Sequence, residues 1–235
     1  MHKRINGKGV KAVRMPKERL IFMRRIKILR LLLGSLSGAL LIAAAVVGVC
    51  IYSEGVTARQ GAQELLAQYE QAASFFSSST AAAEEYIPPE KPDVEPADAF
   101  KAGQTLSGYQ VIGKLTIQKI GVELPVISHM DEKSLKVSVC YYEGAIPGEM
   151  GNMVISGHNY KNGAHFGKLD ELEIGDPVIF ETPDEIIWRY EVYDTQVVKP
   201  DNIEALEECE EQYELTLLTC TSQGNRRLLI RCRII

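Results

Sequence analysis

The sequence predicts a mainly β fold, a closed or nearly closed β-barrel with short helices, preceded by one N-terminal transmembrane helix. Two observations lead to this prediction. A block of 22 residues without charge runs from Leu31 to Tyr52. From about Gly108 onwards, short β-rich runs are separated by turn residues, a spacing typical of a barrel.

The apolar block is long enough to cross a bilayer. At ~1.5 Å per residue, a helix over Leu31–Tyr52 would span about 33 Å. A cleaved signal peptide is the alternative, and the small residues Ala43–Ala45 leave cleavage open. The apolar region of such a peptide is usually about 7–15 residues, which is shorter than this block. A buried core helix is disfavoured because the block is apolar on all sides. We therefore expect a retained single-pass anchor in the cell membrane.

The charge distribution predicts the orientation of this anchor. The chain holds 26 basic and 31 acidic residues, of which residues 1–52 contribute 11 and one, respectively. A basic flank of this kind stays in the cytoplasm, so the N-terminus is expected inside and everything after Tyr52 outside. The remaining 15 basic and 30 acidic residues give the exterior part a charge of −15. That charge argues against nucleic acid as a partner.

Two further segments separate the apolar block from the β-rich region. Residues 53–86 are mostly polar, and Leu65, Leu66, Tyr69, Ala72, Ala73 and Phe76 fall near helical spacing. We interpret this stretch as a stalk helix that acts only as a spacer. Residues 87–96 contain four prolines and favour an extended linker. The expected organisation is a cytoplasmic basic tail (1–30), a transmembrane helix (31–52), a stalk and linker (53–107) and a folded catalytic domain (108–235).

Alternation and turn residues predict the elements of the folded domain. Strands are expected at 111–117, 122–127, 152–156, 177–181, 186–198, 214–219 and 227–235. Short helices are expected at 131–137, 164–172 and 202–209.

The five cysteines indicate a free thiol and no metal centre. An odd number of cysteines in an exported chain leaves at least one unpaired. No Cys-x-x-Cys pair or Cys/His cluster with zinc spacing is present, so we expect no metal and no cofactor. The Glu-rich stretch 204–214 could attract calcium, but a solvated acidic helix and loop explains it better. The cysteines are Cys50, Cys140, Cys209, Cys220 and Cys232.

Cys220 is the candidate nucleophile. A cysteine taken alone is more often a small buried hydrophobe. Cys220, however, ends an apolar run, and Gly224-Asn225 then provides a tight turn before Arg226 and Arg227 open the next run. Two adjacent strands would place a guanidinium beside the thiol. Such a group favours the thiolate and can donate hydrogen bonds to an oxyanion.

His158 is the candidate acid/base. It follows an apolar strand and Gly157, at a junction between strand and loop. An isolated histidine there would be interpreted as a surface residue, but the combination with a cysteine and an arginine favours catalysis. His129 precedes a charged helix start and His165 lies where a short helix should begin, so both are interpreted as structural or surface residues.

Several motifs resemble those of the sortase family. These are Thr-Leu-Leu-Thr-Cys at 216–220, Arg-Leu-Leu-Ile-Arg at 227–231, and Gly-His-Asn at 157–159 with the preceding segment 144–152. The likeness covers residues 111–235 in the order of the family. It implies an eight-stranded β-barrel and a catalytic site of Cys220, His158 and Arg227. Arg226 stays an alternative to Arg227, because neighbouring residues on a strand point to opposite faces and only one can enter the site.

The resemblance also implies an activity. Sortases are membrane-anchored cysteine transpeptidases, thiol-protease-like hydrolases or acyltransferases, that act on surface proteins with a C-terminal sorting signal of the Leu-Pro-x-Thr-Gly kind. They pass the acyl group to an amine, here expected to come from a cell-wall precursor. The short interval between Trp188 and Cys220 favours a general-purpose or related compact type, and no lid motif of a pilin polymerase is seen.

Four other functions compete with this one. A pilin-polymerising sortase stays an alternative, as does a non-enzymatic exterior binding module. A plain cysteine peptidase would release free acid even when amine is abundant. An L,D-transpeptidase is disfavoured because the string Ser-His-Gly-Cys is absent from the chain.

Overall fold

The computed structural model describes residues 17–77, 104–146, 149–202, 206, 213–221 and 224–235. The chain divides into two compact units, Met1–Cys50 and Ile51–Ile235, which are considered separately. The Pro-rich linker at 87–96 and Cys209 lie outside the described residues, as does most of the helix expected at 202–209.

A single long helix, α1, covers Lys17–Ser77. Its segment Leu33–Ser74 is long and apolar enough to cross a membrane by length and composition, a test that a signal sequence also passes. In the first unit its large apolar side chains are exposed, including Leu36, Leu40 and Ile42. Exposed leucine and isoleucine on all sides are favourable in lipid and costly in water. The predicted apolar helix is therefore present.

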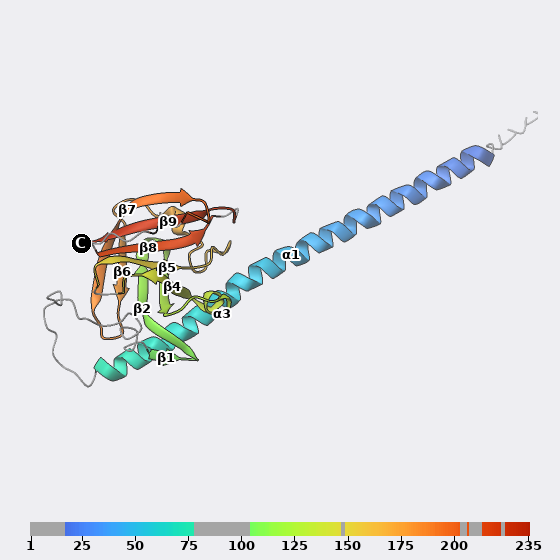
Figure 1. Cartoon of the computed structure of the whole chain (residues 1–235). Coiled ribbons are helices and arrows are strands. Elements are labelled where there is room, and N and C mark those ends of the chain that lie inside the picture. The colour runs from blue at the N-terminus through green and yellow to red at the C-terminus, as the bar shows by residue number, and fades with distance from the viewer. Residues whose placement is uncertain (1–16, 78–103, 147–148, 203–205, 207–212, 222–223) are drawn as a thin grey trace, which may run out of the picture. The chain divides into compact units, whose positions relative to one another are not determined.

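The second unit contains a closed β-barrel (Figure 1). Its strands follow the order β2-β3-β4-β5-β8-β9-β7-β6, and pairing of β2 with β6 closes the ring. A ninth strand, β1 (Gln104–Leu106), pairs with β2 outside the ring. The eight-stranded barrel is thus confirmed. Its strands are β2 (Tyr109–Ile117), β3 (Val122–Ile127), β4 (Val139–Gly144), β5 (Gly151–Ser156), β6 (Pro177–Glu181), β7 (Ile187–Val198), β8 (Tyr213–Cys220) and β9 (Arg227–Ile234).

Apolar side chains fill the barrel interior. They come from alternate positions of the strands, which is why the sequence alternates between apolar and polar residues. Each fully buried leucine, isoleucine or phenylalanine contributes about 1.5–3 kcal/mol relative to exposure. The largest of these fully buried side chains include Leu115, Ile117, Phe180, Leu215, Leu217 and Ile230.

The C-terminal part of α1 packs against the barrel, which corrects its interpretation as a free spacer. Ala58, Ala62, Leu65 and Tyr69 are each at most 2% exposed and repeat every three or four residues along one helix face. Leu65 and Tyr69 share an apolar cluster with residues of β2, β3 and β4. Figure 1 shows this teal segment running past β1 and α3 (Glu132–Val137). The helix is therefore part of the folded domain.

The structure adds two strands to the predicted elements and removes one helix. β4 was not predicted, and β1 begins before Gly108, where the domain was expected to start. The helix expected at 164–172 is wrong, because only a 3-10 turn, η3 (Leu169–Glu171), forms there. His165 has a φ of 48°, which a right-handed helix cannot contain. The helix expected at 131–137 is present as α3, and Asp131 caps it by accepting a hydrogen bond from Ser134 N at 2.7 Å.

Candidate active site

Two parallel strands bring His158 and Cys220 to the same edge of the barrel. β5 pairs with β8 in register, with Ser156 opposite Leu218. Parallel strands end at the same edge, and both candidate residues come two positions after this pair. Gly157 N extends the match by donating to Leu218 O at 3.1 Å. The strand register therefore places the histidine level with the cysteine.

An antiparallel pair brings Arg227 beside the same thiol. Arg227, the first residue of β9, lies directly opposite Cys220, the last residue of β8. Directly opposite residues point to the same face, with Cβ atoms about 4.5–5.5 Å apart. Arg226 precedes β9, and its side chain is exposed. The alternation of a strand thus gives the position beside the thiol to Arg227.

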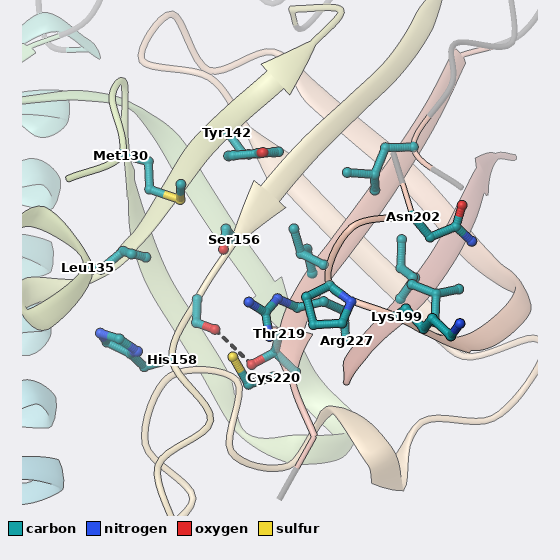
Figure 2. Close-up of a pocket in the computed structure, with 16 residues that line it drawn as sticks. Met130, Leu135, Tyr142, Ser156, His158, Lys199, Asn202, Thr219, Cys220 and Arg227 are labelled. Carbon is teal, nitrogen blue, oxygen red and sulfur yellow. Dashed lines mark hydrogen bonds between the residues drawn. The ribbon is translucent and has the colours of Figure 1, made fainter. Parts of the chain in front are cut away.

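Cys220, His158 and Arg227 line one cleft of about 280 Å³. Figure 2 shows the imidazole and the guanidinium on different sides of the Cys220 sulfur, in a cleft that also carries apolar side chains. Arg226 is not among the residues that line it. A peptide bound in this cleft would contact the Cys220 sulfur, the Arg227 guanidinium and the His158 imidazole, together with an apolar surface. The apolar lining includes Met130, Leu135, Tyr142, Val198, Pro200, Leu206 and Leu229.

Two side-chain hydrogen bonds fasten the histidine loop to the end of β8. Thr219 Oγ1 donates to Gly157 O at 2.7 Å, the dashed line in Figure 2. Asn159 Nδ2 donates to Cys220 O at 2.7 Å. The sequence alone assigns no role to either Thr219 or Asn159. The Gly-His-Asn string could have indicated the role of Asn159, because a polar residue next to the acid/base can reach the end of the neighbouring strand.

Gly157 allows the loop to leave β5 close to the core. A Cβ atom at this position would lie 2.7 Å from side-chain atoms of both Phe166 and Val139. Such a distance is far shorter than a normal carbon–carbon contact. Any larger residue would push His158 away from the end of β8.

Comparison with known proteins identifies the family. The family model described as "Sortase domain" matches residues 115–235, which is half of the chain. The chain belongs to the sortase family. It is 33% identical over 141 residues to Sortase A of Bacillus anthracis, covering 59% of this chain and 65% of that protein. It is 34% identical over 113 residues to Sortase D of Bacillus subtilis (strain 168), covering 47% of this chain and 54% of that protein. The chain therefore matches only about half to two thirds of the length of these curated relatives.

A solved structure agrees with the barrel. The Clostridium perfringens Sortase D5 transpeptidase superimposes with a TM-score of 0.53 and 22% identity, covering 77% of this chain and 99% of that one. At this identity the likeness concerns the fold. The matched relatives carry both A and D designations, so their names do not select one sub-class.

Burial makes the imidazole of the sortase domain less basic. The pKa of His158 is lowered from 6.5, first because burial disfavours the charged ring and second because the Lys136 ammonium repels it. The carboxylates of Glu132 and Glu54 act in the opposite direction. The net effect leaves the imidazole neutral at neutral pH, ready to accept a proton.

The other described cysteines and histidines lie elsewhere. Cys140 and Cys232 are fully buried in apolar clusters, where burial raises the pKa of Cys140 to about 12 and that of Cys232 further still. Cys50 lies in the apolar segment of α1. His129 is on the surface, and His165 is 3% exposed. Neither histidine lines the cleft that holds Cys220.

No described cluster resembles a metal site. Within the parts of the chain that the structure describes, no three His, Cys, Asp or Glu side chains lie close enough to hold an ion. Glu214, the last residue of the Glu-rich stretch, instead accepts hydrogen bonds from Arg231 at 2.7 Å and Tyr193 at 2.9 Å. The rest of that stretch lies outside the described residues, apart from Leu206 and Tyr213.

Proposed function

We propose that this sortase is a cysteine transpeptidase that cleaves a C-terminal sorting signal of surface proteins. The signal is of the Leu-Pro-x-Thr-Gly kind, and the acyl group passes to an amine of the cell envelope. The observation that supports this function is the convergence of Cys220, His158 and Arg227 on one cleft. The apolar part of that cleft suits the leucine and proline of the signal, because apolar side chains gain free energy on leaving water.

The first half of the reaction forms a thioester. Neutral His158 takes the proton of the Cys220 thiol, the resulting thiolate attacks the carbonyl carbon of the signal threonine, and a tetrahedral species with a negative oxygen forms. Arg227, held opposite Cys220 by the β8–β9 register, donates hydrogen bonds to this oxygen. The carbon–nitrogen bond then breaks, and protonated His158 gives its proton to the leaving amine.

The second half transfers the acyl group. An incoming amine attacks the thioester carbon while neutral His158 accepts its proton. The carbon–sulfur bond breaks, and the thiolate of Cys220 is restored. The lowered pKa of His158 supports this step, since a neutral imidazole is the form that can take a proton. In this proposal no cofactor is needed.

The proposed location is the outer face of the cell membrane. The apolar segment of α1 would anchor the chain, with its basic flank in the cytoplasm and the barrel outside. Partners in this proposal are surface proteins with a sorting signal, and a cell-wall precursor that supplies the amine.

The test uses the full chain in detergent with a Leu-Pro-x-Thr-Gly peptide and triglycine. We expect a product in which the peptide threonine is joined to triglycine, detected by mass spectrometry. Cys220→Ala should abolish both cleavage and transfer, and Cys50→Ala should preserve them. Full activity of Cys220→Ala would refute the proposal. Free acid as the only product in excess amine would indicate a peptidase instead.

A further inference from the structure

A second cavity meets the catalytic cleft at His158. This groove, about 620 Å³ in volume, lies between the start of the docked part of α1, the α3 residue Lys136 and the loop after β5. Of all the residues that line the two cavities, His158 is the one they share. Figure 2 shows its imidazole on the side of the cleft nearest the pale blue α1. The ring can therefore be reached from two directions.

The proposed reaction has a use for both directions. His158 acts on two different nitrogen atoms, the amine that leaves with the end of the signal and the amine that enters. During the second step the acyl chain still occupies the cleft of about 280 Å³. An incoming amine that reaches His158 from the other cavity avoids this chain.

The groove carries a carboxylate suited to an ammonium group. Glu54 on α1 lines it and is exposed. Among the described residues, none forms an ion pair or hydrogen bond with this carboxylate that would occupy it. The neighbouring acid Glu132 differs, because it binds Lys136 at 2.7 Å. The field of Glu54 nonetheless reaches the imidazole, since it raises the pKa of His158 against the effect of burial.

An aromatic ring stands between the groove and the core. Tyr160 lines the groove and contacts His158 edge to face, with ring centroids 5.3 Å apart. Tyr160 also contacts the ring of His165, with centroids 5.2 Å apart. An aromatic ring attracts a cation placed over its face, so Tyr160 adds to the attraction of Glu54. The exposed Lys161 offers a positive charge to an acidic part of the same ligand.

We propose that this groove binds the acceptor, a primary amine on a polar, peptide-like chain, with its ammonium group at Glu54 and Tyr160. The inference rests on the proposed transpeptidase function. The bound ammonium loses one proton to solvent, and the resulting amine attacks the thioester carbon. A carbon–nitrogen bond forms, the carbon–sulfur bond breaks, and the second proton passes to neutral His158 as sulfur leaves as thiolate. Glu54 is thus a binding residue for the second substrate only.

The experiment compares the wild-type full chain with Glu54→Gln in detergent, using triglycine as the cationic acceptor. The variant should raise the KM for triglycine roughly fivefold, the effect of one partly solvated ion pair. The ratio of triglycine transfer to hydrolysis without amine should fall by a similar factor, because a change that acts through the pKa of His158 affects both reactions. Hydroxylamine, which is uncharged near neutral pH, should show no such loss. Glu64→Gln, an exposed acid on the same helix outside the groove, is the matched control.

A second variant tests the groove by its volume. Thr57→Trp places a large side chain in it and should also raise the KM for triglycine while hydrolysis continues. An unchanged KM in both variants would overturn the inference and leave the transpeptidase intact. Equal losses in hydrolysis and transfer would also overturn it, since they indicate a structural role. A wild-type chain that forms no acyl-enzyme would refute the proposed function itself, and the inference with it.

Discussion

The two walls of the catalytic cleft are held in different ways. On the strand wall, Cys220 and Arg227 are fixed by the backbone ladder of β8 and β9. On the loop wall, His158 lies beyond the end of β5 and depends on contacts from other elements. Phe166 N donates to His158 O at 3.0 Å, and Asn159 bridges to His165 as well as to Cys220. The register of two neighbouring strands is sufficient to position the residues of the strand wall. The position of the loop wall depends on contacts from the whole domain, including α1.

The largest expected effect lies on the strand wall. Arg227→Ala should lower kcat for peptide cleavage by about 10²–10³, the usual loss for one oxyanion donor. Arg227→Lys should restore part of the rate, since it keeps a charge without the fork of donors. Steady-state kinetics on the sorting-signal peptide measures both.

Arg226→Ala is the matched control, because this neighbouring side chain is exposed and does not line the cleft. It should retain the wild-type rate. If Arg226→Ala loses as much activity as Arg227→Ala, the register does not select the catalytic arginine.

The next effect concerns the support of the loop wall. Burial lowers the pKa of His165 from 6.5 to about 4, and its Nε2 lies 3.4 Å from Ala58 O on α1. Below pH 6.5 the unfolded chain takes up this proton before the folded chain does, so acid favours unfolding. His165 should therefore cost up to roughly 3 kcal/mol of stability as the pH falls from 6.5 to 4.

Urea unfolding across this pH range measures that loss. His165→Gln, which cannot take up a proton, should flatten the pH dependence and retain only the smaller contribution of other groups such as His158. An identical pH dependence in the variant would show that the imidazole is not buried against α1.

Sequence reasoning succeeded where local pattern determines structure. Alternation predicted seven of the barrel strands, and the positions of Cys220 and His158 at strand ends followed from apolar runs that stop. β1 was missed because Gln-Thr-Leu has no pattern of its own and forms by pairing with β2.

The loop wall was less predictable because tertiary contacts determine it. The helix expected around His165 does not form because His165 has a positive φ, and no local sequence pattern predicts that φ. The docking face of α1 begins with small residues, where a Cβ on Gly55 would lie 2.3 Å from the Asn162 side chain. The large apolar residues alone therefore predicted the helix at 53–76 but not its packing against the barrel.

A smaller effect tests the link between the two walls. Asn159→Ala removes the hydrogen bond from Nδ2 to Cys220 O, a loss of about 1 kcal/mol. We expect kcat to fall by roughly five- to tenfold, because His158 loses its position relative to the thiol. A peptide KM and melting temperature close to wild type would identify Asn159 as a positioning residue. An unchanged kcat would show that the loop is held without it.

The smallest effect concerns the charge beside the imidazole. The Lys136 ammonium is the second cause of the lowered pKa of His158, after burial. Lys136→Met should therefore raise this pKa, and Glu132→Gln should lower it. NMR titration of the His158 ring in Cys220→Ala chains measures both shifts. Shifts of the same sign in the two variants would contradict the electrostatic account.

The most direct test of the central claim is mass spectrometry of a stalled acyl-enzyme. The full chain is mixed with a panel of sorting-signal peptides without added amine, quenched and digested. The account predicts that the acyl mass, ending at the signal threonine, appears on the fragment that contains Cys220. An acyl group on another cysteine, or none while the peptide is still cleaved, would contradict it.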